Sequence, residues 1–215
     1  IYQMPPIVLM SDDRIKRQGY EPIVNGLDTL TSSMRFPNYQ LSDTFRLGAN
    51  AAKLTGLFYD GTLNSLSKEP RLFPEEKEGP ILVPMDMPIG DPTPSDAIKK
   101  AVSIAANLIK QNKKTEIAIL SVLVKTTTAL QVEVARTMGN VNNILVETVA
   151  RVQGITKDVT IYVIPYTDSM VHSLELRLFN VATSRAKENT YIICPKNIKD
   201  YTYMSDKVRH YLNSL

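Results

Sequence analysis

Short runs of aliphatic and β-branched residues alternate along the chain with longer segments that have helical periodicity. Each run is too short for a helix and is bounded by polar or turn-forming residues, so the runs predict buried strands. The predicted strands are Ile81 to Val83, Ile117 to Val124, Ile144 to Val149, Val159 to Ile164 and Tyr191 to Cys194.

Apolar residues at helical spacing predict three helices between these strands. Thr93 is the expected N-cap of the first helix and Pro94 its first residue, while Gly139 is expected to end the second. Strands that alternate with helices predict a parallel sheet joined by right-handed crossovers. The expected fold is therefore a three-layer α/β domain, with ligands at the carboxyl ends of the strands. The predicted helices are residues 94–113, 127–138 and 174–187.

The composition is that of a globular protein. The chain has 215 residues, of which 43% are hydrophobic and 22% are charged, which fits one large domain or one domain with an appendage. The net charge of +3 permits nucleic-acid binding without arguing for it. Residues 64–80 are charged, contain prolines and show no periodicity, so they are predicted to be an exposed loop, as are residues 86–92.

Cysteine and histidine are too scarce to build several kinds of site. Cys194 is the single cysteine, and with only His172 and His210 it cannot complete a zinc-type ligand set. Cys194 is expected to be a small core residue, and one unpaired cysteine favours a reducing, cytosolic setting. No apolar stretch approaches the ~20 residues that a membrane-spanning helix needs. A chain that begins at Ile1 without a basic leader is expected to be a fragment of something longer.

The sequence has no motif that would cradle a nucleotide phosphate. No stretch fits GxxxxGKS, GxxxxGKT or GxGxxG. Ser/His/Asp and Cys/His sites are also disfavoured, because both histidines lie in polar contexts. The sequence therefore predicts no complete catalytic site within this chain.

Three polar stretches contain the candidate functional residues. Residues 153–158 (QGITKD) form a turn between two apolar runs, which is either a ligand-binding loop or an ordinary connection with Gly154 at positive φ. Arg185 lies late on an otherwise apolar predicted helix. It is either a functional cation, a surface arginine whose aliphatic part packs on the helix, or a cation that stabilises the helix C-terminus. Residues 41–63 place Arg46 after a strand-like segment and FYDG at the end of the next helix.

In chain order these stretches resemble the second RecA-like motor domain of superfamily 1 helicases, especially the branch that includes the nonsense-mediated-decay RNA helicase. TFR followed by FYDGTL resembles the family's YR and FYxGxL elements, VETVARVQGITKD resembles motif V (TVDxFQGxExD), and NVATSRAK resembles motif VI (NVALTRAK). YQMPP at residues 2–6 resembles the end of motif III (GDxxQLPP). The resemblance implies that the phosphate cradle and the Mg²⁺-binding acidic motif belong to a preceding RecA-like domain.

The same resemblance implies that ATP lies between two RecA-like domains and that the second supplies arginines to the γ-phosphate. Arg46 and Arg185 become the arginine-finger candidates, because a planar, permanent cation stabilises charge spread over phosphoryl oxygens. Gln3 corresponds to the motif III glutamine that senses the γ-phosphate. The loop expected at the nucleotide contains Gln153, Gly154 and Thr156.

Two departures from motif V leave a second class of function open. Thr156 replaces the glutamate that contacts the ribose in the family, and Ala150 replaces the aspartate of TVD. The alternative is a non-catalytic RecA-like scaffold or interaction module. In either case the resemblance implies that residues 1–38 are the tail of the first motor domain and its connection, and that residues 39–215 are the second.

The implied partner is single-stranded nucleic acid, with DNA slightly favoured over RNA, together with the first motor domain. Small hydroxyl side chains suit phosphate contacts that do not read sequence. Thr148 matches the motif V threonine and is the first candidate. Ser121 and Thr126 follow from a looser resemblance of AILSVLVKTTTALQ to the family's ITPYxxQ segment, and Thr126 could equally be a helix N-cap. By itself the chain is expected neither to bind ATP tightly nor to hydrolyse it.

Overall fold

The computed structural model describes residues 42–215 except positions 60, 62, 69, 140 and 153. The described residues form one unit, Ser42–Leu215. The expectations for Gln3 and Gln153 lie outside the described residues, and so does the boundary expected after residue 38.

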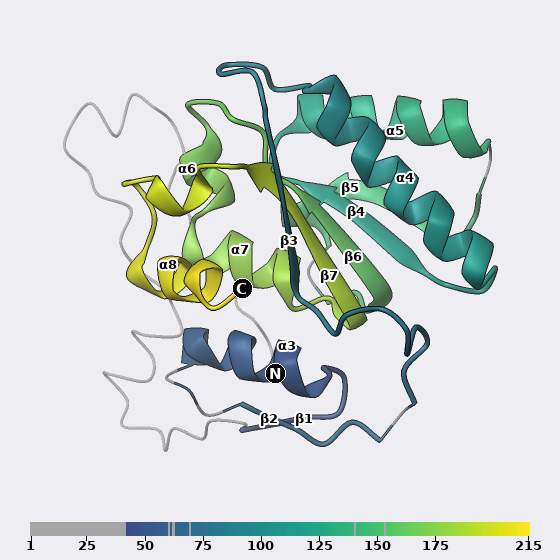
Figure 1. Cartoon of the computed structure of the whole chain (residues 1–215), viewed down its shortest axis with the longest axis vertical. Helices are drawn as coiled ribbons and strands as arrows, with labels where there is room; N and C mark the ends of the chain where they lie inside the picture. The colour runs from purple at the N-terminus through teal and green to yellow at the C-terminus, as the bar shows by residue number, and fades with distance from the viewer. Residues whose placement is uncertain (1–41, 60, 62, 69, 140, 153) are drawn as a thin grey trace, which may run out of the picture. The chain divides into compact units, whose positions relative to one another are not determined.

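A five-stranded sheet lies at the centre of the described unit (Figure 1). Its strand order is β3-β7-β6-β4-β5, and every neighbouring pair is parallel. The five predicted strands are all present. However, β7 begins at Ala186 rather than at Tyr191, and β4 ends at Ser121 rather than at Val124. The strands are β3 (Ile81–Met85), β4 (Ile117–Ser121), β5 (Ile144–Thr148), β6 (Lys157–Val163) and β7 (Ala186–Pro195).

Helices cover both faces of this sheet (Figure 1). Side chains alternate between the faces along a strand, so Ile117 and Ile119 of β4 share a core with one set of helices, whereas Ala118 and Leu120 share a core with the other. This arrangement confirms the predicted fold class, a RecA-like three-layer α/β domain with a parallel sheet. One layer contains α4 (Ser95–Gln111) and α5 (Val124–Met138), and the opposite layer contains α6 (Met170–Ser173), α7 (Leu176–Thr183) and α8 (Asp206–Asn213).

The segment before the sheet is attached to the second layer through aromatic packing. The Phe58 ring stacks on Tyr211 of α8 with centroids 5.3 Å apart and meets the Phe179 ring of α7 edge-on at 6.1 Å. Phe58 therefore fixes its neighbours, including Tyr59, against α7. The segment comprises β1 (Asp43–Thr44), α3 (Ala49–Gly56), the 3₁₀ turn η1 (Leu57–Tyr59) and β2 (Asn64–Ser65), with β1 and β2 paired in parallel.

Several helix boundaries differ from the sequence prediction. Helix α7 ends at Thr183 rather than at residue 187, because Ala186 already pairs with Lys157 in the sheet. Pro94 occupies the N-cap position of α4, and the Thr93 hydroxyl instead donates to Asp91 at 3.1 Å. The predicted helix 127–138 begins earlier, at Val124, and ends as expected at Gly139, whose φ is 70°.

The segment 64–80 is not simply an exposed loop. Phe73 is buried and packs in the core beneath α4, and Gly79 and Pro80 are also buried. Hydrophobic periodicity could not show this, because one aromatic residue in a charged segment carries no pattern. No helix among the described residues is long and apolar enough to cross a membrane.

Cys194 is the buried core residue that the sequence predicts. It is fully buried in β7, and burial raises the pKa of its thiol to about 12. Because the thiolate is the reactive form, we expect no alkylation of the folded protein by iodoacetamide at pH 8 and complete alkylation after unfolding in urea. Mass spectrometry of both samples checks this, and rapid labelling of the folded protein would contradict the burial of Cys194.

Candidate functional site

Arg46 lies just after β1 in a turn built by the preceding threonine. The backbone N–H groups of Arg46 and Leu47 both point to Thr44 Oγ1, at 3.3 and 3.4 Å, which is a hydroxyl-stabilised turn. Leu47 is buried and its carbonyl accepts a hydrogen bond of 2.6 Å from Ser65 Oγ. Arg46 is therefore carried on a short segment that is fixed on both sides.

Arg185 lies in the junction between α7 and β7, not on the helix as predicted. Its Nε donates to the Val181 carbonyl at 3.0 Å, and its Nη2 donates to Ser184 Oγ at 3.3 Å. Arg185 thus caps the C-terminus of α7, as one of the alternatives from the sequence requires. These two bonds orient the guanidinium while leaving three of its five N–H donors for other partners.

The structure brings Arg46 and Arg185 together from distant parts of the sequence. Burial lowers the pKa of Arg185, the neighbouring charge of Arg46 lowers it further, and Tyr59 opposes both effects. Burial likewise lowers the pKa of Arg46, again opposed by Tyr59. Tyr59 is held beside both arginines by a hydrogen bond of 2.9 Å that its hydroxyl accepts from Asn180 Nδ2 on α7. We call Arg46, Tyr59, Asn180 and Arg185 the arginine pair site.

The arginine pair site holds two like charges, and the residues that the structure describes supply no acid to neutralise them. Within the part of the chain that the structure describes, neither Arg46 nor Arg185 forms an ion pair with a carboxylate. The Nε of Arg46 is buried and has no hydrogen-bond partner among the described residues. Two neighbouring guanidinium groups repel each other, and a buried donor without a partner is unfavourable. A bound anion would relieve the repulsion between the two guanidinium groups, so the site fits a phosphate-type ligand.

The turn that contains Gly154 and Thr156, which resembles motif V in sequence, lies at the same end of the sheet. Gly154 has a φ of 89°, the positive value expected if this turn is an ordinary strand connection, and Thr156 is half-buried. Lys157 then begins β6, and its N–H donates to the Arg185 carbonyl at 3.0 Å. Arg185 and this loop thus lie at the amino ends of β7 and β6. The expectation that ligands gather at carboxyl ends does not describe this site, because its arginines are carried by segments that precede the strands.

The nucleic-acid candidates lie at the opposite edge of the sheet. Thr148 and Ser121 end β5 and β4 and are partners in register. Ser121 is fully buried and its hydroxyl donates to the Val163 carbonyl at 2.9 Å, and Thr126 is also buried, with its hydroxyl bonded to the Pro92 carbonyl at 2.6 Å. Neither hydroxyl is offered to a ligand in this conformation, and Thr126 is not an N-cap because α5 begins at Val124.

Thr148 is half-buried and already bonded to an acidic neighbour. Its N–H and hydroxyl lie 2.7 and 3.2 Å from Glu147 Oε1. The backbone bond from Thr148 is the main reason why the pKa of Glu147 is lowered, so this carboxylate is negatively charged at neutral pH. A phosphate at Thr148 would have to compete with that charge, and this cost is not visible in the sequence resemblance.

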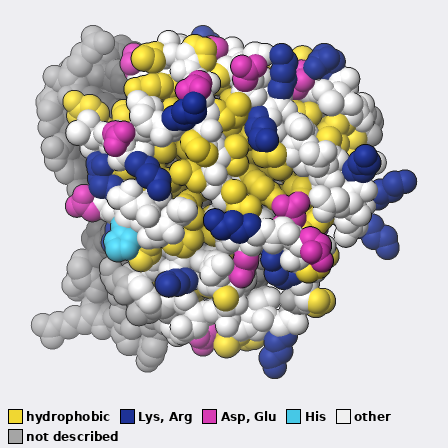
Figure 2. Space-filling view, in the orientation of Figure 1, with side chains coloured by type: hydrophobic (Ala, Val, Ile, Leu, Met, Phe, Trp, Pro, Cys, Tyr) yellow, Lys and Arg dark blue, Asp and Glu magenta, His cyan; other side chains and the backbone are white. Residues whose placement is uncertain are grey.

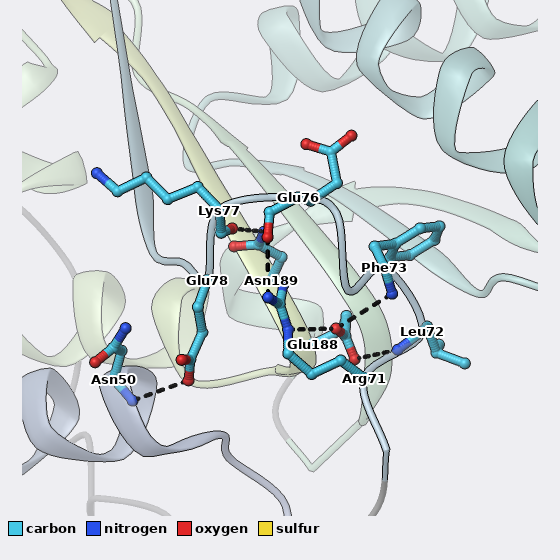
Figure 3. A network of polar contacts seen from close by, with 9 residues as sticks. All are labelled: Asn50, Arg71, Leu72, Phe73, Glu76, Lys77, Glu78, Glu188 and Asn189. Carbon is cyan, nitrogen blue, oxygen red and sulfur yellow. Dashed lines mark hydrogen bonds and ion pairs between the residues drawn. The ribbon is translucent and has the colours of Figure 1, made fainter.

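A network centred on Glu188 was not anticipated from the sequence (Figure 3). Glu188, near the start of β7, accepts from Arg71 Nε at 3.0 Å and from the N–H groups of Leu72 and Phe73 at 2.9 and 3.5 Å. Asn189 Nδ2 donates to the Lys77 carbonyl at 3.0 Å. Figure 3 shows this strand end holding the long 66–80 segment by both charged and backbone contacts. We call the contacts of Glu188 the loop clamp.

The segment held by the loop clamp also contacts α3, the helix that follows Arg46. Glu78, at the end of the clamped segment, accepts from the Asn50 N–H at 3.2 Å. The sequence gives little sign of the loop clamp, because Glu188 is a single acid near the start of a strand and an exposed surface residue could look the same. No cluster of three or more His, Cys, Asp or Glu residues among the described positions could hold a metal ion.

Comparisons with known proteins give a distant structural likeness. No family model matches the sequence, and no curated protein matches it. Among solved structures, the chain is similar to the C-terminal domain of a possible DNA helicase from Lactobacillus plantarum WCFS1, with 12% identity and a TM-score of 0.46. The match covers 77% of this chain and 92% of that one. A likeness at this identity and TM-score does not identify the ligand, so the functional proposal depends on the residues of the site.

Proposed function

We propose that this chain acts as the second motor domain of an ATP-dependent superfamily 1 helicase or translocase. The observation that carries the proposal is the arginine pair site, in which Arg46 and Arg185 converge from two motifs and lack a carboxylate partner among the described residues. In this role the two guanidinium groups face the γ-phosphate of ATP bound to a first RecA-like domain. The parallel three-layer fold is the framework that such a domain uses.

The chemistry of the site suits stabilisation of phosphoryl charge. Charge in phosphoryl transfer is spread over several oxygens, and an arginine fork can bond two of them while keeping its charge at any physiological pH. Tyr59 and Asn180 connect the two arginine-bearing segments, so the site is organised before a ligand arrives. Mg²⁺ and most of the nucleotide contacts would come from the first domain. The turn containing Gly154 and Thr156 would approach the sugar.

Single-stranded nucleic acid is the proposed polymer substrate, at the carboxyl edge of the sheet near Thr148. Figure 2 shows lysine and arginine side chains scattered among hydrophobic and uncharged ones on the drawn face, with no continuous basic patch. The net charge of +3 is equally mild. Binding by this domain should therefore be weak and salt-dependent, with DNA slightly favoured over RNA and with much of the grip supplied by the first domain.

Replacing Glu147 with glutamine should strengthen nucleic-acid binding. The Glu147 carboxylate lies against Thr148 and repels an approaching phosphate. Removing one charge at about 4 Å in a water-like dielectric is worth roughly 1 kcal/mol, or about fivefold in affinity at low salt. Fluorescence anisotropy with a labelled oligothymidylate measures the change. Glu133→Gln on α5 is the control. An equal gain in affinity in both variants would show that Thr148 is not part of the binding surface.

The direct test of the proposed function compares this chain alone with the same chain joined to its first RecA-like domain. ATPase activity is measured with Mg²⁺, with and without single-stranded DNA or RNA. We expect activity that nucleic acid stimulates in the joined protein only. A scaffold would show no stimulated activity in either form, and robust activity of the 215-residue chain alone would show that the ATP-binding residues lie within it.

A further inference from the structure

A second set of contacts, besides the hydrogen bond of Tyr59, joins the two segments that carry the arginines. These contacts pass through the 66–80 segment, which is bonded both to β7 and to the start of α3 (Figure 3). Arg185 immediately precedes β7, and Arg46 lies just before the N-cap of α3. The segment therefore has one attachment close to each arginine.

The attachment to β7 consists of the loop clamp and the neighbouring asparagine. Glu188 holds the segment at residues 71–73, and Asn189 Nδ2 holds it again by donating to the Lys77 carbonyl at 3.0 Å. The side chain of Glu188 is only 8% exposed, so its bonds are largely protected from competition with water. The segment is thus fixed at two points to the strand that follows Arg185.

The attachment to α3 is a helix cap supplied by a residue far away in the sequence. The first N–H groups of a helix have no partner within it, so a side chain usually accepts from them. The N-cap of α3 is Gly48, which has no side chain, and the first turn contains no acid. Glu78 Oε1 instead accepts from the Asn50 N–H at 3.2 Å, and it would lie 3.2 Å from a Cβ placed on Gly48. The negative charge of Glu78 also suits the positive end of the helix dipole.

This cap differs in kind from the other hydrogen bonds around Arg46. Thr44 and Ser65 hold the Arg46 turn, but both belong to the β1–β2 pair that carries the turn. These bonds shape the turn without fixing its distance from Arg185. Glu78 comes from a segment fastened to β7, so its bond does relate the turn to Arg185.

We propose that Glu78 is a positioning residue for Arg46, which by capping α3 keeps the Arg46 turn at the distance from Arg185 that a shared phosphoryl group requires. The inference rests on the proposed motor function. The charge of Arg46 acts on Arg185, so the two guanidinium groups repel each other and their segments must be held together. Precise placement matters because a small displacement of a catalytic group slows a reaction markedly.

Glu78→Ala tests this inference in the joined protein, with Glu75→Ala as the matched control. Glu75 is an exposed acid of the same segment, and its side chain has no hydrogen bond or ion pair among the described residues. We expect Glu78→Ala to lower kcat about tenfold with little change in the KM for ATP, because Arg46 is present but less often in place. Glu78→Gln keeps an oxygen that can accept from Asn50 and should recover most of the loss. Glu75→Ala should match wild type.

Hydrogen exchange checks the cap without ATP or a second domain. In the 215-residue chain, the amides at the start of α3 should exchange faster in Glu78→Ala than in Glu75→Ala. Equal exchange rates would show that the Glu78 carboxylate does not hold the helix start, and the inference would fail.

A double variant separates positioning from a general loss of stability. In the Arg46→Ala background, Glu78→Ala should cause no further loss of kcat, because the group that it positions is gone. A tenfold loss that persists in that background, or a kcat of Glu78→Ala equal to that of Glu75→Ala, would overturn the inference and leave the motor function standing. Wild-type kcat in Arg46→Ala alone would contradict the motor function itself, and the inference with it.

Discussion

Replacing Arg185 or Arg46 with alanine is expected to lower the nucleic-acid-stimulated kcat of the joined motor by about 10³-fold, as loss of an arginine finger does. The two guanidinium groups lie near enough for the charge of Arg46 to lower the pKa of Arg185, and neither is paired with a carboxylate among the described residues. Neither variant should change the KM for ATP greatly, because both arginines act on charge that develops in the transition state. Steady-state ATPase assays at saturating nucleic acid measure both parameters.

Controls separate catalysis from folding and from general loss of charge. Arg136→Ala removes an exposed arginine of α5 that, among the described residues, pairs only with Glu133 on the same helix, and it should leave kcat unchanged. Arg185→Lys keeps a positive charge but loses the planar guanidinium and its hydrogen bond to the Val181 carbonyl. Its kcat should therefore be little higher than that of Arg185→Ala. A variant of Arg185 that retained wild-type kcat while remaining folded would remove this residue from the catalytic site.

Replacing Glu188 with alanine is expected to destabilise the domain by about 3 kcal/mol, at the low end for loss of a buried ion-pair partner because Arg71 is partly exposed. The variant would leave Arg71 and the Leu72 and Phe73 N–H groups without their shared acceptor. Urea unfolding followed by far-UV circular dichroism gives the free energy of unfolding.

The loop clamp should also be detectable locally. Without Glu188, the 66–80 segment loses its attachment to β7, so limited proteolysis should cut it faster than the rest of the chain. Glu188→Gln keeps one acceptor oxygen and should fall between alanine and wild type. Glu133→Ala, which removes an exposed carboxylate, should change stability little. If Glu188→Ala behaved like Glu133→Ala in both measurements, the clamp would contribute nothing to holding the segment.

The sequence predicted the sheet because each strand contains a short apolar run, although β6 and β7 also include polar residues at their starts. Ile117 to Leu120 is buried on both faces, so nothing in the run is ambiguous. The end of α7 was harder to predict, because Ser184 and Arg185 continue the helical pattern although pairing with β6 draws Ala186 into the sheet. Tertiary hydrogen bonding decided that boundary, and it has no local signature.

The candidate site was predictable only in part. The sequence resemblance made Arg46 and Arg185 the two arginine-finger candidates, and the structure brings them together. No pattern could show that Glu147 would bond to Thr148, because that contact depends on one rotamer beside a strand end. The loop clamp depends on contacts between residues far apart in the sequence, and one sequence alone does not reveal these.

The central claim is that Arg46 and Arg185 act on one phosphoryl group. Single-turnover ATP hydrolysis by the Arg46→Ala, Arg185→Ala and double variants of the joined motor tests this claim most directly. If the arginines act as a unit, the double variant should be only slightly slower than the slower single variant, because either loss already disables the shared site. Multiplication of the two losses to about 10⁶-fold would show that the arginines act independently and contradict the claim.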